Sequence, residues 1–158
     1  RRRPPRATRG PYTTLFRSEG AGPERPEITV KIDVAPVSAP GEVAVPVALF
    51  MVEALANIFK HAFPRPNGSG GVTVMLRRMD GRRVRLAIQD NGVGFAKDGA
   101  KSGIGDRLLK VFGRQIHGTV EVTSEPGKGT VVELIFPVGE SDPREINHDQ
   151  LSAGRVAV

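Results

Sequence analysis

The sequence predicts an α+β fold, a two-layer α/β sandwich in which helices cover one face of a mixed, mostly antiparallel sheet. Five segments alternate apolar and polar residues as half-buried strands do. Four of these segments fall into two hairpin pairs, and two longer segments repeat apolar residues with helical spacing. Both helices need an apolar surface to pack against, which favours placing them together on one face of the sheet.

The first half of the fold is a predicted strand followed by a predicted helix. Residues 27–34 alternate isoleucine and valine with polar residues, which indicates a strand. Residues 43–63 have helical spacing, and Pro46 is tolerated there because it lies near the first turn. Two prolines and three glycines within 64–71 end this helix. Its residues expected to face the core are Leu49, Leu55, Ile58, Phe59 and Ala62.

The next two strands are predicted over residues 72–78 and 84–90. The Asp80-Gly81 pair between them is typical of a tight hairpin turn. We therefore expect these two strands to be antiparallel neighbours.

A second helix and a second hairpin complete the predicted domain. The helix spans 103–118, has apolar residues at every fourth position, and is expected to end at Gly118. Residues 119–124 and 130–138 form the last pair of strands around a glycine-containing turn.

The length and charge of the chain define its domains. The 158 residues suit one folded domain at 27–138, preceded by a linker at 19–26 and followed by a polar tail at 139–158. Six of the 23 basic residues lie in residues 1–18, and the remaining 17 balance the 17 acidic residues. The net charge of +6 therefore belongs to this basic arm, so we expect no nucleic-acid partner for the domain.

The basic arm and the cysteine count give further expectations. The segment "PYTTLFRS" resembles translated sequencing-adaptor read-through, so we expect residues 1–18 to be a sequence artefact outside the fold. The sequence contains no cysteine and no uninterrupted apolar run of membrane-spanning length. We expect a cytoplasmic domain without membrane contact of its own, although the parent protein could be membrane-anchored.

The first helix carries four polar residues among apolar neighbours. At about 100° per residue, Glu53, Asn57, Lys60 and His61 fall on one stripe about 100° wide. Such a stripe on an otherwise apolar helix predicts the wall of a wet, charged cavity. An ordinary solvated face with a glutamate–lysine pair explains the same spacing.

A carboxylate at the end of the strand predicted over 84–90 is the second candidate. Asp90 shares its strand parity with Val84, Leu86 and Ile88, so its side chain is expected to enter the core. A buried carboxylate needs hydrogen-bond donors, which an amine-bearing ring could supply. The glycines at 92 and 94 allow a ligand to approach closely, but a simple turn accounts for them equally well.

Two further motifs are weaker when taken alone. Gly103 and Gly105 open the second helix, where free N–H groups favour phosphate. Thr130 follows the turn "GKG" and begins the last strand. Each motif alone could be an ordinary glycine-rich turn.

In combination, the four motifs resemble a known family. E-x-x-x-N-x-x-K-H-A-F from Glu53, D-x-G-x-G-F from Asp90, G-I-G from Gly103 and G-x-G-T ending at Thr130 closely resemble the N, G1, G2 and threonine boxes of sensor histidine kinases. These boxes belong to the ATP-binding catalytic domain, which has the Bergerat-type fold shared with gyrase and heat-shock chaperones. The "KHAF" sequence and the short lid at 96–102 are most similar to the HisKA_2 and HWE subfamilies.

The resemblance implies ATP and Mg²⁺ as cofactors and assigns a role to each site residue. Asn57 would hold Mg²⁺, Lys60 and His61 would meet phosphate, and Glu53 would polarise the attacking group. Asp90 would accept a hydrogen bond from the adenine amino group. The remaining residues would support the base, form the floor of its pocket, or hinge the lid, and they are Thr130, Gly92, Gly94, Gly103 and Gly105.

The resemblance also implies the reaction and its partners. The domain would transfer the ATP γ-phosphoryl group to a histidine on a dimerisation domain, and a response regulator would act downstream. This chain has no phosphoacceptor box, so we expect that domain to lie upstream in the parent protein. An anti-sigma-type serine kinase of the same fold is the alternative. Asp106 departs from the family pattern, because a small or apolar residue is usual after the G2 glycines.

Overall fold

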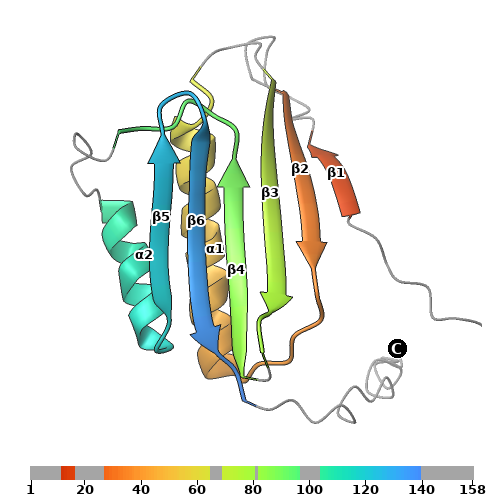
Figure 1. Ribbon diagram of the computed structural model, residues 1–158, viewed down its shortest axis with the longest axis vertical. Coiled ribbons are helices and arrows are strands. Elements are labelled where there is room, and N and C mark those ends of the chain that lie inside the picture. Colours follow the sequence, from red (N-terminus) through yellow and green to blue (C-terminus); the bar gives the residue numbers. More distant parts are fainter. Residues whose placement is uncertain (1–11, 17–26, 65–68, 81, 97–103, 140–158) are drawn as a thin grey trace, which may run out of the picture.

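The computed structural model describes residues 12–16, 27–64, 69–80, 82–96 and 104–139. It contains, in chain order, β1 (Tyr12–Phe16), β2 (Glu27–Val34), α1 (Gly41–His61), β3 (Ser69–Arg78), β4 (Arg83–Asp90), α2 (Ile104–Gln115), β5 (Thr119–Glu125) and β6 (Gly129–Pro137). The strands form one layer and both helices lie behind it (Figure 1). The predicted α+β two-layer sandwich is confirmed.

The sheet is mixed and mostly antiparallel, as predicted. Its strand order is β1-β2-β3-β4-β6-β5. Only β2 and β3 are parallel among the described pairs, and α1 is the crossover that such a pair requires. Both predicted hairpins, β3–β4 and β5–β6, form antiparallel pairs. Gly81 of the first turn lies outside the described residues.

The first strand corrects an expectation about the basic arm. We expected no part of residues 1–18 to join the fold, but Tyr12–Phe16 pairs antiparallel with β2. The sheet therefore has six described strands instead of five. The segment "YTTLF" is rich in residues that favour extended backbone, and the edge of β2 offers free hydrogen-bonding groups. The origin of the arm as an artefact stays a prediction.

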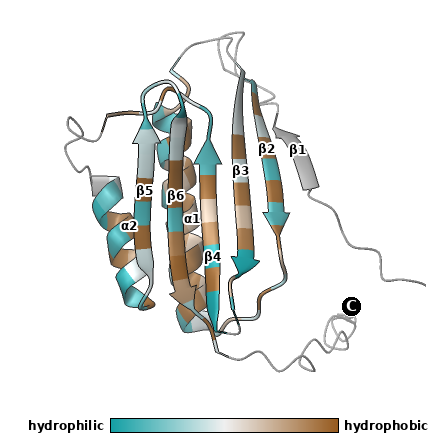
Figure 2. Cartoon of the chain, viewed as in Figure 1, coloured by the Kyte–Doolittle hydropathy of each residue, from teal (hydrophilic) through white to brown (hydrophobic). Residues whose placement is uncertain are grey.

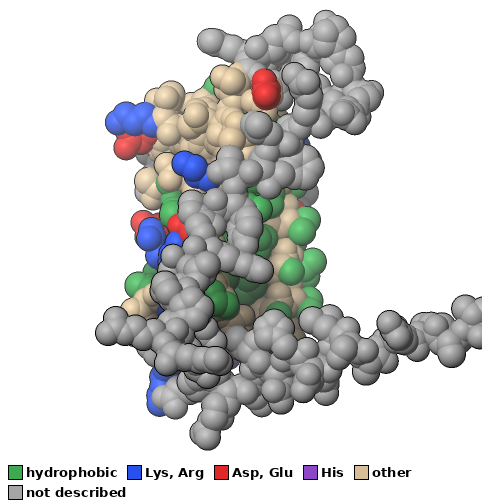
Figure 3. Space-filling model, turned by 90° about the vertical axis from the view of Figure 1, so that its right-hand side faces the viewer, with side chains coloured by type: hydrophobic (Ala, Val, Ile, Leu, Met, Phe, Trp, Pro, Cys, Tyr) green, Lys and Arg blue, Asp and Glu red, His purple; other side chains and the backbone are tan. Residues whose placement is uncertain are grey.

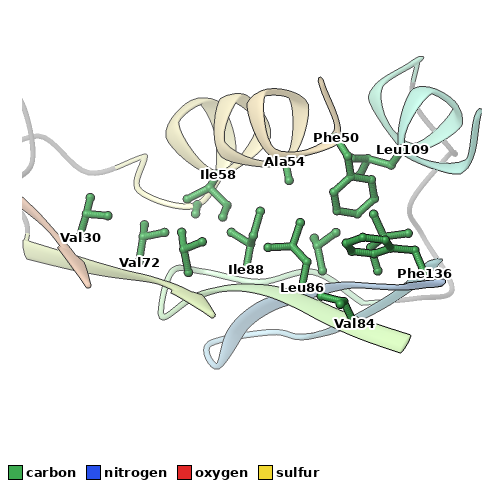
Figure 4. Packing of buried hydrophobic residues seen from close by; sticks show 14 of the residues in the cluster. Val30, Phe50, Ala54, Ile58, Val72, Val84, Leu86, Ile88, Leu109 and Phe136 are labelled. Carbon is green, nitrogen blue, oxygen red and sulfur yellow. The ribbon is translucent and has the colours of Figure 1, made fainter. Parts of the chain in front are cut away.

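The core lies between the sheet and one face of α1. Phe50, Ala54 and Ile58, each four residues apart, point toward buried side chains of β3 and β4 such as Val72 and Leu86 (Figure 4). Along β4, buried hydrophobic residues alternate with mainly polar, exposed ones, whereas β6 is hydrophobic over most of its length (Figure 2). This alternation fixes the register of the central strands.

Two residues of α1 do not lie where we expected. Leu49 and Phe59 were predicted to face the core, but they are 45% and 51% exposed. The helix is apolar on almost every side except the polar stripe, so its composition does not identify the face that meets the sheet. The exposed apolar residues of α1 are Val45, Leu49, Val52 and Phe59.

The surface seen from the β1 side reflects this arrangement. Hydrophobic side chains gather toward the helix flank, whereas the charged ones lie mainly along the opposite flank (Figure 3). The charged residues on the uncovered face of the sheet include two cross-strand ion pairs, Arg77–Asp33 and Arg85–Glu133.

Helix α1 is also long and apolar enough to cross a membrane, by length and composition alone. It is the one described helix that meets this criterion. In the fold it packs on the sheet through Phe50, Ala54 and Ile58, and a core helix passes the same test.

The end of α2 differs in detail from the prediction. His117, not Gly118, adopts the left-handed backbone, with φ of 55°. Gly118 is required for another reason, because a Cβ there would lie 2.9 Å from Leu134 Cδ1 and 3.0 Å from the Ile135 carbonyl oxygen. Its N–H donates to the Gly113 carbonyl oxygen at 2.8 Å, which closes the helix.

Candidate functional site

A cavity of about 1000 Å³ opens between α1, the start of α2 and the ends of β4, β5 and β6. Both polar residues and apolar side chains such as Ile58, Val122 and Val132 line it. The predicted site residues along this cavity are Glu53, Asn57, Lys60, His61, Asp90, Gly94, Gly105 and Thr130. Gly103 lies outside the described residues.

The polar stripe of α1 forms one wall of this cavity. Glu53, Asn57, Lys60 and His61 all line it. The glutamate and the asparagine are half-buried, whereas the lysine and the histidine are exposed in the last turn of the helix. The two hydrogen-bond donors at the rim suit an anionic ligand. The two oxygen-bearing side chains deeper inside suit a cation bound to that ligand.

Gly105 brings the first turn of α2 directly against this stripe. A Cβ at Gly105 would lie 2.6 Å from Glu53 Oε1 and 2.8 Å from Asn57 Nδ2. Any side chain at this position would therefore displace the two deepest residues of the stripe. The glycine allows backbone N–H groups at the start of a helix to face the same cavity.

Asp106 follows this glycine and also lines the cavity. Its carboxylate accepts a hydrogen bond from Lys110 Nζ at 2.9 Å, one helical turn further on. The ion pair offsets the negative charge that this departure from the family pattern places at the start of α2.

Asp90 is a buried polar group that also lines the cavity. Its side chain is only 2% exposed, as its strand parity predicted. The Gly92 N–H donates to Asp90 Oδ1 at 2.8 Å, and the Thr130 backbone N–H donates to the same carboxylate. Burial raises the pKa of Asp90, and these two backbone donors partly oppose the rise. The carboxylate is thus held in place with acceptor capacity left for a ligand.

The loop after Asp90 is clamped on both sides. The Val93 N–H donates to the Ala62 carbonyl oxygen at 2.9 Å, and the Gly127 N–H donates to the Val93 carbonyl oxygen at 2.7 Å. A Cβ at Gly92 would collide with the Ala62 carbonyl group. Gly94 has φ of 58°, and a Cβ there would collide with the Glu125 carbonyl group. These glycines are therefore required by close backbone contacts, and of the two only Gly94 is among the residues that line the cavity.

Ser124 is a residue of this site that we did not predict. It is 7% exposed, and its hydroxyl lies 2.9 Å from both the Phe95 backbone nitrogen and Thr130 Oγ1. A signal was present in the sequence, because Ser124 shares the strand parity of the inward residues Val120 and Val122. The same argument that identified Asp90 would have identified Ser124.

The chain matches one family model over most of the folded domain. The model describes histidine kinase-, DNA gyrase B- and HSP90-like ATPases, and it matches residues 42–140. The chain belongs to this ATPase family. The motifs that carried the resemblance in the sequence all lie within the matched range.

Sequence relatives agree with the family. The chain is 36% identical over 98 residues to sensor histidine kinase LiaS of Bacillus subtilis, a match that covers 61% of this chain and 26% of that protein. It is 28% identical over 119 residues to blue-light-activated histidine kinase 2 of Erythrobacter litoralis, covering 73% of this chain and 34% of the relative. The matches therefore span about a quarter to a third of these relatives.

Solved structures agree as well. The histidine kinase domain of a blue-light activated histidine kinase from Erythrobacter litoralis superposes with a TM-score of 0.65 at 28% identity, covering 75% of this chain and 54% of that one. A mycobacterial sensor histidine kinase, MprB, superposes with a TM-score of 0.59 at 20% identity, covering 72% and 86%. The second match supports the fold alone.

Proposed function

We propose that this chain is the ATP-binding catalytic domain of a two-component sensor histidine kinase. It would transfer the γ-phosphoryl group of ATP to a histidine on a dimerisation domain elsewhere in the parent protein, and a response regulator would act downstream. The observation that carries the proposal is the polarity of the cavity. One cavity brings together a buried carboxylate, which suits the adenine amino group, and the stripe of α1, which suits a triphosphate with its cation.

The donor set of the stripe fits Mg²⁺. Asn57 offers an amide oxygen and Glu53 a carboxylate beside it, and Mg²⁺ prefers a few hard oxygen ligands together with phosphate and water. Mg²⁺ would neutralise charge on the transferring phosphoryl group. Among the described residues there is no group of three or more histidine, cysteine or acidic side chains that could hold a metal.

The residues of the chain would then act mainly by positioning and electrostatics. Lys60 and His61 would donate to phosphate oxygens at the rim, and Gly105 would bring helix N–H groups toward them. Glu53 would accept a hydrogen bond from the attacking imidazole and hold it in line with the γ-phosphoryl group. Catalysis of phosphoryl transfer depends largely on such placement.

The alternative is an anti-sigma-type serine kinase of the same fold. The relatives named above carry the names of sensor histidine kinases, and this favours the first proposal. The HisKA_2 or HWE subfamily and a cytoplasmic location for the domain stay part of the proposal.

Nucleotide binding is expected to require Asp90. Asp90→Asn replaces one acceptor oxygen by an amide donor that faces the ligand amino group. The unsatisfied contact should weaken ADP binding by about 1–3 kcal/mol, measured by titration calorimetry on the full chain. The affinity of the native chain for ADP should also fall as pH is lowered through the raised pKa of Asp90, because protonation removes an acceptor.

Asp33→Asn is the matched control for this experiment. It makes the same chemical change on β2, on the face of the sheet away from the cavity, where Asp33 pairs with Arg77. We expect it to leave ADP affinity unchanged. Equal affinities in the native chain and in Asp90→Asn would exclude Asp90 as the residue that reads the base.

Asn57 and Asp90 are expected to differ in how their replacement affects nucleotide binding with and without Mg²⁺. Asn57→Ala should weaken Mg-ATP binding much more than metal-free ADP binding, because the amide is assigned to the cation. The exposed amide of Gln89 on β4 provides the control, and Gln89→Ala should change neither affinity. If Asn57→Ala weakens both ligands equally, the asparagine has a structural role instead.

A further inference from the structure

The hydroxyl of Ser124 is one of two buried polar side chains among the described residues, and the other is Asp90. It belongs to none of the four boxes that carried the family resemblance. It nevertheless lies beside both the loop that follows Asp90 and the threonine of the last box. The contacts of this one hydroxyl determine how its proton must be placed.

Three groups surround Ser124 Oγ at hydrogen-bonding distance. The Phe95 backbone N–H lies at 2.9 Å and can only donate. The Gly129 carbonyl oxygen lies at 3.1 Å and can only accept. Thr130 Oγ1 lies at 2.9 Å and can do either. A hydroxyl has one proton and two acceptor positions.

One arrangement satisfies all three contacts. Ser124 accepts from the Phe95 N–H and donates its proton to the Gly129 carbonyl oxygen. Its second acceptor position is then filled by the hydroxyl proton of Thr130. In the reverse arrangement the proton of Ser124 points to Thr130, and the buried carbonyl oxygen of Gly129 loses its hydrogen bond to the serine, at a free-energy cost.

This arrangement has a consequence for the cavity wall. The proton of Thr130 is directed at Ser124, so Thr130 Oγ1 presents only lone pairs to the cavity that it lines. The neighbouring Asp90 carboxylate, when ionised, also presents only acceptors. This end of the cavity therefore accepts ligand groups that donate hydrogen bonds and disfavours a carbonyl oxygen.

We propose that Ser124 is a positioning residue that fixes the Thr130 hydroxyl as an acceptor and thereby makes the pocket select a 6-amino purine over a 6-oxo purine. The inference rests on the proposed nucleotide function and adds a specificity-determining residue to it. Without the serine hydroxyl, Thr130 can turn its proton toward the ligand and donate to a ring carbonyl. Ser124 acts only through Thr130 in this scheme.

The test compares ADP with inosine diphosphate, which carries an oxo group in place of the amino group. Titration calorimetry on the full chain should give a preference for ADP. Ser124→Ala should lower the ADP-to-inosine-diphosphate affinity ratio about tenfold, the change expected when one mismatched polar contact is relieved. Ser124→Thr keeps the hydroxyl and should keep the ratio. Thr123→Ala, at the exposed neighbouring position on β5, should also leave it unchanged.

A second mutation shows whether the serine acts through the threonine. In a Thr130→Val background, Ser124→Ala should have no further effect on the ratio. If Ser124→Ala does not fold, Ser124→Cys takes its place, because a thiol of similar size accepts a hydrogen bond only weakly.

The outcomes are distinguishable. An unchanged ratio in Ser124→Ala, or an equal loss of affinity for both nucleotides, overturns the inference and leaves the serine a structural residue. If Ser124→Ala still lowers the ADP-to-inosine-diphosphate affinity ratio in the Thr130→Val background, the inference is overturned as well. A native chain that binds neither nucleotide overturns the proposed function itself.

Discussion

Replacing Glu53 by glutamine should slow phosphoryl transfer about 10²–10⁴-fold, because a positioned carboxylate typically contributes that factor to the chemical step. The change keeps the size of a half-buried side chain that lies against Gly105, so the cavity should keep its shape. Nucleotide affinity should change little. The measurement is the rate of transfer from Mg-ATP to a histidine-containing dimerisation domain supplied in trans, since this chain carries no phosphoacceptor box.

The control for this experiment is Glu42→Gln in the first turn of the same helix. Glu42 is exposed and does not line the cavity, so its loss should leave the rate unchanged. The acid stability of the product identifies the reaction, because phosphohistidine is acid-labile and phosphoserine is not. An acid-stable product on a protein partner would favour the serine kinase alternative.

Gly129→Ala is expected to produce the largest loss of stability in the β5–β6 turn. Gly129 has φ of 84°, and a Cβ there would collide with the carbonyl group of Asp90. The left-handed backbone costs about 1–2 kcal/mol, and overpacking against a fixed neighbour adds about 1–3 kcal/mol. The free energy of unfolding, measured in urea, should fall by the sum of these terms, and ADP affinity should fall because Asp90 is displaced.

Gly127→Ala separates the two contributions. Gly127 lies in the same turn with φ of 77°, but nothing lies within 4 Å of its Cβ position. The variant should lose only about 1–2 kcal/mol, from backbone strain. It should keep the ADP affinity of the native chain. If the free energy of unfolding falls equally in Gly127→Ala and Gly129→Ala, the predicted collision with the Asp90 carbonyl group does not destabilise the fold.

The elements of the fold were predictable because the strands alternate regularly and the turns contain strong signals. The paired strands β3–β4 and β5–β6 and both helices lie within a few residues of their predicted bounds. The orientation of α1 was not predictable to the same degree. A helix that is apolar on most sides can turn either Phe50 or Leu49 toward the sheet, and only the packing of the folded chain decides between them.

The site was predictable where a polar residue interrupts an apolar pattern. Asp90 and the stripe from Glu53 to His61 are such interruptions, and the fold brings them to one cavity. The hydrogen bonds that hold Val93 between Ala62 and Gly127 were not foreseen, because they join backbone atoms. Glycines are the only residues in a sequence that indicate where backbone segments far apart in the chain will come into close contact.

The position of β1 has a consequence for how the domain behaves among other copies of itself. With β1 in place, β2 is an interior strand of the described sheet. A chain that began at residue 19 would expose β2 along eight residues, of which Glu27, Lys31 and Asp33 are charged and none is proline. The free backbone groups of an edge strand can template intermolecular strand pairing, although charged side chains oppose it. Removing the basic arm would therefore remove charge repulsion and open a route to aggregation in the same step.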